Sequence, residues 1–153
     1  MKILIVAIGK LNKKSPEQAL IDSYISKTRW PVAVIQTEEK KALHGQELQE
    51  AEGSLLLKQV PAGYKIVALD ERGDEPSSRA FARKIGRWRD EGTAGIAFLI
   101  GGADGHPNIV RNKADWLLSF GRMTLPHFLA RVVLSEQIYR AKTILDGHPY
   151  HRD

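Results

Sequence analysis

The sequence predicts an α/β protein with a mainly parallel sheet and helices on both faces. Short apolar runs rich in β-branched residues alternate with segments of helical periodicity, which is the pattern of βα units. The chain has 153 residues, a length that suits one core. We therefore expect residues 1–153 to form a single domain, since no repeat, low-complexity tract or linker interrupts them.

The first strand and the first helix are expected near the N-terminus. The apolar run Ile3–Ile8 is too short for a signal sequence or a membrane span, so Lys2–Ile8 is expected to be a buried strand. Ser15, Pro16 and Gln18 supply an N-cap, a proline at the first helical position and a glutamine for a capping box. The helix that begins there is expected to end near Trp30-Pro31.

The middle of the chain continues the alternation. Strands are expected at Val32–Thr37, Tyr64–Asp70 and Gly95–Ile100, because each is a short apolar run bounded by turn residues. A helix over about Gln46–Val60 separates the first two of these strands. A second helix over 78–91 precedes the third strand, and closes at Gly92.

The helix expected over 78–91 has a core face and a basic face. Phe81, Ile85 and Trp88 recur at helical spacing and form the apolar stripe. The basic residues of this helix are Arg79, Arg83, Lys84, Arg87 and Arg89. Together with a formal net charge of +5 they favour a polyanionic partner, although a solvated surface helix explains the same pattern.

The C-terminal third is expected to hold a helix near Pro107–Leu118, a short strand-like piece at Ser119–Leu125, and a last helix over about His127–Leu145. The last helix is long and apolar on more than one side. Such a helix needs burial around most of its circumference. In a chain of this size, a partner subunit is a plausible second cover.

Two kinds of chemistry are disfavoured by the composition. The chain has no cysteine, which excludes disulfides, thiolate catalysis and a cysteine-based zinc site, and fits a cytoplasmic protein. No two histidines have the i, i+4 spacing of a metal site, and none lies among clustered carboxylates, so we expect no metal. His44 reads as a solvated residue and His106 as a turn residue.

Three loops follow the carboxyl ends of expected strands, where open parallel sheets bind ligands. They are Leu69–Gly73, Gly101–Gly105 and Phe120–Pro126. The glycine loop Gly101–Gly105 is neither a Gly-x-Gly-x-x-Gly fingerprint nor a Walker motif, and it does not follow the first strand. Its bare backbone suits the edge of an adenine or a ribose better than a triphosphate.

The last residues, Gly147–Asp153, are an unusual chain end. Termini commonly consist of small polar residues, whereas this one contains Tyr150, His151 and Arg152. An aromatic ring, an imidazole and a guanidinium can stack on a base and contact a phosphate. The tail therefore predicts contact with RNA, although an inconsequential surface tail is the alternative.

Five motifs occur in a fixed order along the chain. They are Leu69-Asp70-Glu71-Arg72-Gly73 with Ser77-Ser78, Ile100-Gly101-Gly102-Ala103-Asp104-Gly105, Met123-Thr124-Leu125-Pro126-His127, Glu136-Gln137-Ile138-Tyr139-Arg140-Ala141 and Pro149-Tyr150-His151-Arg152. Together they resemble the SPOUT superfamily of RNA methyltransferases, and within it the pseudouridine-N3-methyltransferases of 23S rRNA. The resemblance covers essentially the whole chain.

The resemblance implies a C-terminal trefoil knot, a homodimer, S-adenosylmethionine as the methyl donor, and N3 of a pseudouridine in a 23S rRNA stem-loop of the assembled ribosome as the acceptor. Carried over by position, the cofactor-binding residues are Leu69, Gly102, Phe120, Gly121, Arg122, Met123, Thr124 and Leu125. The stretch Ser119-Phe120-Gly121-Arg122 departs from the Ser-Leu-Ser that is common in related sequences.

The chemistry implied by the resemblance needs a proton acceptor, because N3 of a pseudouridine is a weakly acidic imide. Histidine suits this role near neutral pH, and both His127 and His151 are candidates. Arg152 can hold a phosphate or favour the imide anion, and Tyr150 can stack on the base. A tail supplied by the opposite subunit would make the dimer obligatory.

Two other functions stay open from the sequence. A non-catalytic ribosome-binding or RNA-binding module would use the basic helix and the tail but would have no saturable S-adenosylmethionine site. An α/β nucleotide-binding oxidoreductase would use Gly101–Gly105 to bind NAD, although the first-strand fingerprint is absent.

Overall fold

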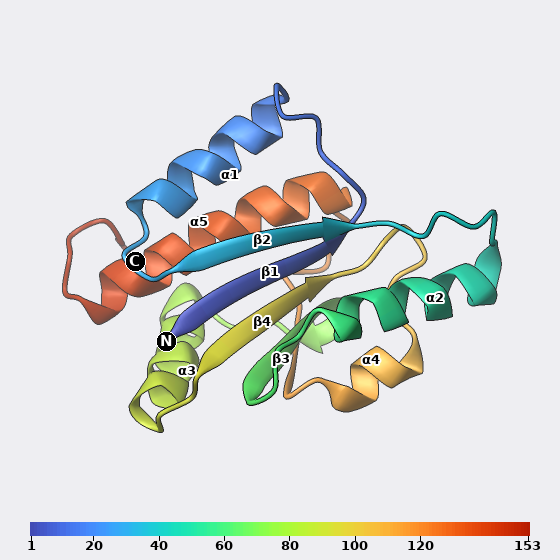
Figure 1. Ribbon diagram of the computed structural model, residues 1–153. Helices are drawn as coiled ribbons and strands as arrows, with labels where there is room; N and C mark the ends of the chain where they lie inside the picture. Colours follow the sequence, from blue (N-terminus) through green and yellow to red (C-terminus); the bar gives the residue numbers. More distant parts are fainter.

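The computed structural model describes all of residues 1–153 and contains one five-stranded parallel sheet (Figure 1). The strand order is β2-β1-β4-β3-β5, and every pair of neighbours is parallel. The strands are β1 (Lys2–Ile8), β2 (Val32–Thr37), β3 (Tyr64–Asp74), β4 (Gly95–Ile100) and β5 (Trp116–Leu118). The helices are α1 (Pro16–Lys27), α2 (Gly45–Lys58), α3 (Ser78–Asp90), α4 (Asn108–Lys113) and α5 (His127–Leu145).

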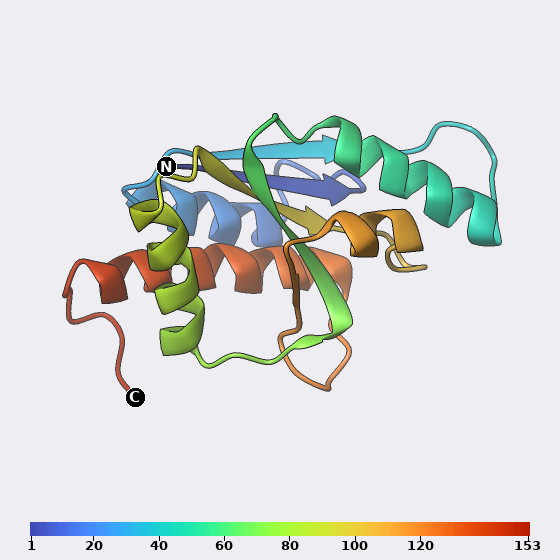
Figure 2. The ribbon, with the colours of Figure 1, turned by 90° about the horizontal axis from the view of Figure 1, so that it is seen from below.

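The sheet separates two hydrophobic cores, which confirms the predicted three-layer α/β arrangement. On one face α3 and α5 pack against alternate strand residues such as Ile5 and Phe98, and α1 packs on α5. On the other face Leu56 of α2 and Val110 of α4 cover Val6 and its neighbours. Figures 1 and 2 show these two groups of helices on opposite sides of the sheet.

The start of α1 follows the predicted N-cap. The Ser15 hydroxyl accepts a hydrogen bond from Gln18 N at 3.2 Å, and Pro16 occupies the first helical position of α1. The predicted capping box was wrong, because the Gln18 side chain donates to Asp22 at 2.9 Å and Ser15 N donates to Asn12 O at 3.0 Å. The Ser77 hydroxyl accepts from Ala80 N at 3.1 Å and begins α3. Phe81, Ile85 and Trp88 are buried on α3, as their spacing predicted.

Two predicted elements of the C-terminal third were wrong. The helix expected near Pro107–Leu118 ends at Lys113, and the short strand is Trp116–Leu118 instead of Ser119–Leu125. The cause is a set of long-range bonds to β3, which itself runs four residues beyond Asp70.

These bonds hold residues 115–119 alongside β3. Asp115 N donates to Ile66 O at 2.8 Å, and Ser119 N donates to Asp74 O at 2.8 Å. The Trp116 indole N–H donates to the Asp74 carboxylate at 2.9 Å. A β-bulge between Leu69 and Asp74 shifts the register at this edge. Residues 120–126 are thereby left as a loop beyond β5.

Arg131 of α5 is the largest fully buried side chain, with 2% of its surface exposed. Its guanidinium donates to Ile8 O at 2.6 Å, to Gly9 O at 2.7 Å and to Gln36 Oε1 at 2.7 Å. One side chain thus joins the ends of β1 and β2 to α5. None of the helices is long and apolar enough to span a membrane.

Candidate active site

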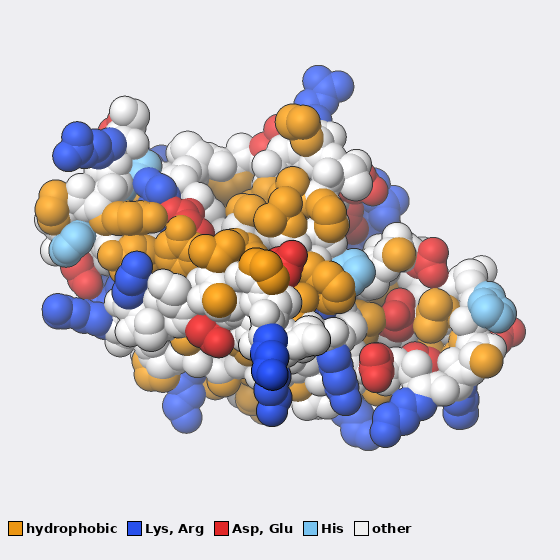
Figure 3. All heavy atoms as spheres, turned by 90° about the horizontal axis from the view of Figure 1, so that it is seen from above, with side chains coloured by type: hydrophobic (Ala, Val, Ile, Leu, Met, Phe, Trp, Pro, Cys, Tyr) orange, Lys and Arg blue, Asp and Glu red, His pale blue; other side chains and the backbone are white.

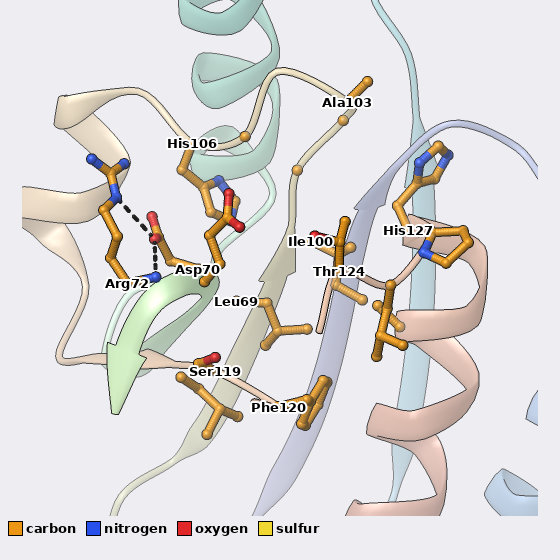
Figure 4. A pocket seen from close by; sticks show the side chains of 18 of the residues that line it. Leu69, Asp70, Arg72, Ile100, Ala103, His106, Ser119, Phe120, Thr124 and His127 are labelled. Carbon is orange, nitrogen blue, oxygen red and sulfur yellow. Dashed lines mark hydrogen bonds and ion pairs between the residues drawn. The ribbon is translucent and has the colours of Figure 1, made fainter. Parts of the chain in front are cut away.

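The three segments singled out from the sequence meet at one pocket of about 500 Å³. The prediction of a loop at Leu69–Gly73 was wrong: these residues belong to β3, which runs to Asp74 because it pairs with β5. The pocket therefore lies beside the C-terminal half of β3 and at the carboxyl ends of β4 and β5, close to where open parallel sheets bind ligands. Figure 4 shows Leu69, Ile100, Phe120 and Thr124 from these different segments around one space. The strand order, with β4 beside β3 and β3 beside β5, produces this convergence.

Most of the predicted cofactor residues line this pocket. They are Leu69, Gly102, Phe120, Gly121, Met123, Thr124 and Leu125. Arg122 does not line it; its side chain is exposed. The candidate base His127 also lines the pocket, at the first residue of α5 (Figure 4).

The walls of the pocket are of two kinds. Leu69, Phe120 and Leu125 offer apolar side chains, whereas the glycine loop Gly101–Gly105 offers backbone amides and carbonyls. A volume of this size lies in the range of drug-sized ligands. An adenosine can bury its flat base against the apolar side and bond its polar edge to the loop, so the pocket fits S-adenosylmethionine.

A carboxylate with two arginine partners lies in the pocket wall. The side chain of Asp70 is 5% exposed, and its Oδ1 accepts from Arg72 N at 2.9 Å and from the Arg72 guanidinium at 3.3 Å. Arg111 of α4 lies 3.3 Å from Oδ2. Burial raises the pKa of Asp70, but the hydrogen bonds from Arg72 and the charges of Arg72 and Arg111 outweigh it and hold this pKa below the ordinary value.

We expect Asp70→Asn to lower the free energy of unfolding by about 1–3 kcal/mol at pH 7, since Arg72 loses a charged acceptor and Arg111 loses its ion-pair partner. Because the pKa of Asp70 is depressed, its contribution to stability is fully present at pH values above 3.8 and is lost as the pH falls through the folded-state pKa. The difference between the two proteins should therefore shrink as the pH falls below 3.8. Urea titrations from pH 7 to pH 2 measure it.

The matched control is Asp90→Asn, which removes an exposed carboxylate paired with Arg89. Surface pairs contribute little, so this variant should unfold like the parent at every pH. An Asp70→Asn protein as stable as the parent at pH 7 would contradict the account.

His106 and His127 are both held towards the neutral form. Burial lowers the pKa of His106, whose Nε2 lies 3.1 Å from Leu99 O. Burial and then the charge of Arg131 lower the pKa of His127, whose ring lies 4.3 Å from that of Phe128. His127 is therefore unprotonated near neutral pH and able to accept a proton. His106 was predicted to be a turn residue, but the turn lies at Ala103-Asp104, and His106 follows the glycine loop as a buried residue.

The residues of the predicted tail lie away from the pocket. The Tyr150 hydroxyl donates to Glu136 Oε1 at 3.0 Å, and His151 Nδ1 lies 3.0 Å from an Arg140 guanidinium nitrogen. Asp153 binds both His151 and Arg79. His127 and Arg140 are separated on α5 by roughly 20 Å at the helical rise of 1.5 Å per residue. Figures 1 and 2 show the C-terminus at the far end of α5.

The structure adds residues to which the sequence had assigned no contact. Glu136 and Arg140 form an ion pair on one face of α5, and Arg140 also lies 4.8 Å from the centre of the Tyr150 ring. The i, i+4 spacing of Glu136 and Arg140 predicts an ion pair on the helix, but it does not predict that this pair contacts the tail. Burial of Tyr150 and its hydrogen bond to Glu136 raise its pKa to about 12.

An apolar band lies on the edge of the molecule formed by α1 and α5 (Figure 3). Leu20 of α1 is 47% exposed and Leu129 of α5 is 42% exposed. Exposed large aliphatic side chains on two neighbouring helices can mark an interaction surface. The band lies beside the helix whose first residue, His127, lines the pocket.

Comparison with known proteins gives matches over almost the whole chain. A family model described as "Predicted SPOUT methyltransferase" matches residues 1–151. A protein of Paramagnetospirillum magneticum named "Ribosomal RNA large subunit methyltransferase H" is 51% identical over 152 residues, which cover 99% of each chain. A protein of Rhodospirillum centenum with the same name is 49% identical over 152 residues, again with 99% of each chain covered.

Among solved structures, a probable methylase family protein of Haemophilus influenzae superposes with a TM-score of 0.57 and 13% sequence identity. The match covers 99% of this chain and 70% of the other. At this identity the likeness concerns the fold alone. It agrees with the parallel sheet and flanking helices described above.

Proposed function

The chain belongs to the SPOUT methyltransferase family, and from this premise we propose that it methylates ribosomal RNA of the large subunit with S-adenosylmethionine. The specific acceptor we propose is N3 of a pseudouridine in a 23S rRNA stem-loop of the assembled ribosome. The observation that carries the proposal is the pocket beside the C-terminal half of β3 and at the ends of β4 and β5, which fits the cofactor. The reaction would take place in the cytoplasm.

The three segments that meet at the pocket are proposed to hold the cofactor. Leu69, Phe120 and Leu125 would cover the adenine, while the backbone of Gly102 and of the 120–125 stretch would bond its polar edge and the ribose. When bound, S-adenosylmethionine supplies a methyl group that is electrophilic because a sulfonium carries it. Arg122 would contribute through its backbone, since its side chain is exposed.

We propose that the active form is a homodimer in which each tail completes the site of the other subunit. Within one chain the tail packs beside Glu136 and Arg140, roughly 20 Å along α5 from the start of the pocket. The apolar band at Leu20 and Leu129 would be covered by the partner. In that arrangement Tyr150 stacks on the target base and Arg152 holds a phosphate or the imide anion. We also propose that the C-terminal part of the chain forms the trefoil knot of the SPOUT fold.

The proton on N3 must leave for the methyl group to be accepted, and His127 or His151 is proposed to take it. His127 has a lowered pKa and lies at the pocket. His151 lies in the tail beside Arg140. Besides removal of the N3 proton, the other large share of the rate enhancement comes from holding N3 in line with the methyl group of the donor.

Comparing His127→Ala with His151→Ala separates the two candidates. We expect the variant that lacks the base to lose methylation roughly 100-fold or more. If His127 is the base, the parent rate should rise with pH through the lowered pKa of the ring, which lies below 6.5, and stay constant above it, because only the neutral ring accepts a proton. His127→Ala should abolish that rise. Single-turnover rates between pH 5.5 and pH 8.5 measure both effects.

His44→Ala is the matched control, because His44 is exposed and makes no side-chain capping bond at the start of α2. It should methylate at the parent rate at every pH. If both active-site variants also retain the full rate, neither histidine is the base.

Calorimetric titration with S-adenosylmethionine tests the proposed function against its two alternatives. The proposal predicts saturable binding at one site per chain. A non-catalytic RNA-binding module predicts no heat of binding, and a nucleotide-dependent oxidoreductase predicts binding of NAD instead. Either result would refute the proposal.

A further inference from the structure

The buried carboxylate of Glu52 lies directly behind the glycine loop and has no role in the reaction proposed above. Glu52 of α2 is 8% exposed, and its Oε1 makes no hydrogen bond. No ion pair neutralises it. A buried charge without a partner costs free energy, and such groups in native proteins are usually retained for a reason.

The two carboxylate oxygens of Glu52 lie against Gly102. A Cβ atom at position 102 would lie 2.9 Å from each of them. The absence of a side chain at Gly102 therefore makes room for Glu52, on the side of the loop that faces α2. The backbone of the same residue lines the cofactor pocket. In Figure 4 helix α2 stands behind the loop between Ile100 and His106.

Helix α2 is well placed to control this loop. Gln49, one turn before Glu52, donates its amide to Asp104 O at 2.8 Å and to His106 O at 3.3 Å. Gly53 packs so closely on Pro107 that a Cβ there would overlap the proline ring. The helix is thus fixed against the loop and the residues that follow it. Burial and then the charges of Asp104 and Glu39 raise the pKa of Glu52.

We propose that Glu52 is a positioning residue for the cofactor: when the glycine loop closes on S-adenosylmethionine, backbone amides of Gly102–Asp104 donate hydrogen bonds to its carboxylate. The inference rests on the proposed function. Amide bonds to a charged acceptor are about twice as strong as neutral ones. Oε1 of Glu52, which has no hydrogen-bond partner in the free protein, would obtain one only in the complex. This new bond would stabilise the closed loop relative to the open loop.

The test is the isosteric variant Glu52→Gln, compared with Glu50→Gln. Glu50 lies two residues away on α2, is exposed, and accepts a bond only from Gln46, so its substitution removes the same charge outside the contact. Three quantities are measured for each protein: the Kd for S-adenosylmethionine, the Tm of the free protein, and hydrogen exchange of the amides at 102–105 with and without S-adenosylmethionine.

We expect Glu52→Gln to weaken S-adenosylmethionine binding about 10-fold or more, by the loss of a charged hydrogen bond. The Tm of the free protein should stay equal or rise, because the unpartnered buried charge is gone. Cofactor-dependent protection of the loop amides should disappear. At saturating cofactor the kcat should stay close to that of the parent, while KM for the cofactor rises. Glu50→Gln should match the parent throughout.

A merely structural role gives the opposite pattern, in which the Tm falls and the Kd does not change. That result, or a Glu52→Gln protein that binds within about twofold of the parent and protects the same amides, overturns the inference. Failure of the proposed function is distinct from both, since the parent chain itself would then bind no S-adenosylmethionine.

Discussion

Deletion of Tyr150–Asp153 is expected to lower methylation by roughly 1,000-fold or more while leaving S-adenosylmethionine affinity within about twofold of the parent. The deletion removes a stacking ring, a candidate base and a guanidinium at once. The cofactor should still bind, because no residue of the tail lines the pocket of its own chain. Single-turnover methylation of ribosomes and calorimetry with S-adenosylmethionine measure the two effects.

Mixing variants tests whether the tail acts across the proposed dimer. The tail-deleted chain is refolded with an equal amount of a Gly102→Val chain, whose side chain would meet Glu52 and disturb the cofactor loop. Each homodimer is expected to be inactive, but half of the dimers should pair an intact pocket with an intact tail at one site. Activity should return to about a quarter of the parent value, if the proposed dimer has two-fold symmetry.

No recovery in the mixture would show that a tail serves the pocket of its own subunit. Full activity of the tail-deleted chain alone would remove the tail from the mechanism altogether. Both outcomes leave the assignment of the cofactor pocket untouched.

Arg131→Met is expected to be strongly destabilising, with a loss of about 2–4 kcal/mol in the free energy of unfolding. The carbonyls of Ile8 and Gly9 and the amide of Gln36 all lose their charged donor. Burial lowers the pKa of Arg131 to about 10, so relief of its desolvation offsets part of the cost. The Tm should fall by roughly 5–15 °C.

The matched control is Arg83→Met on the exposed face of α3, which should leave the Tm unchanged. A second measurement follows the effect of the Arg131 charge on His127. The guanidinium of Arg131 helps to lower the pKa of His127, so its removal should raise that pKa in an NMR titration. An Arg131→Met protein as stable as the Arg83→Met protein would contradict the role given to this side chain.

The sheet and the location of the pocket could be predicted because their signals are local. The strand run that ends at Ile100 is followed directly by its loop, so the sequence alone places Gly101–Gly105 at a strand end, whereas Leu69–Gly73, expected to be a loop, continues β3. The parallel pairing then brings these segments together. The tail was recognisable from its composition, but nothing local indicated that it packs on Glu136 and Arg140.

The errors and omissions all arise from contacts between distant parts of the chain. Trp116–Leu118 is a strand because Asp74 and Ile66 bind its flanks, about 40 or more residues earlier in the chain. Arg131 reaches Ile8, 123 residues away. Glu52 resembles a solvated residue of α2 until the fold places Gly102 against it.

The central claim is tested most directly by mass spectrometry of 23S rRNA. Large subunits and assembled ribosomes from a strain that lacks this gene are incubated with the purified chain and S-adenosylmethionine labelled in its methyl group. The account predicts one labelled methyl group, on N3 of a single pseudouridine of the assembled ribosome, and none with the tail-deleted chain. Unlabelled rRNA from the parent reaction, or label on a nucleotide other than a pseudouridine, would contradict it.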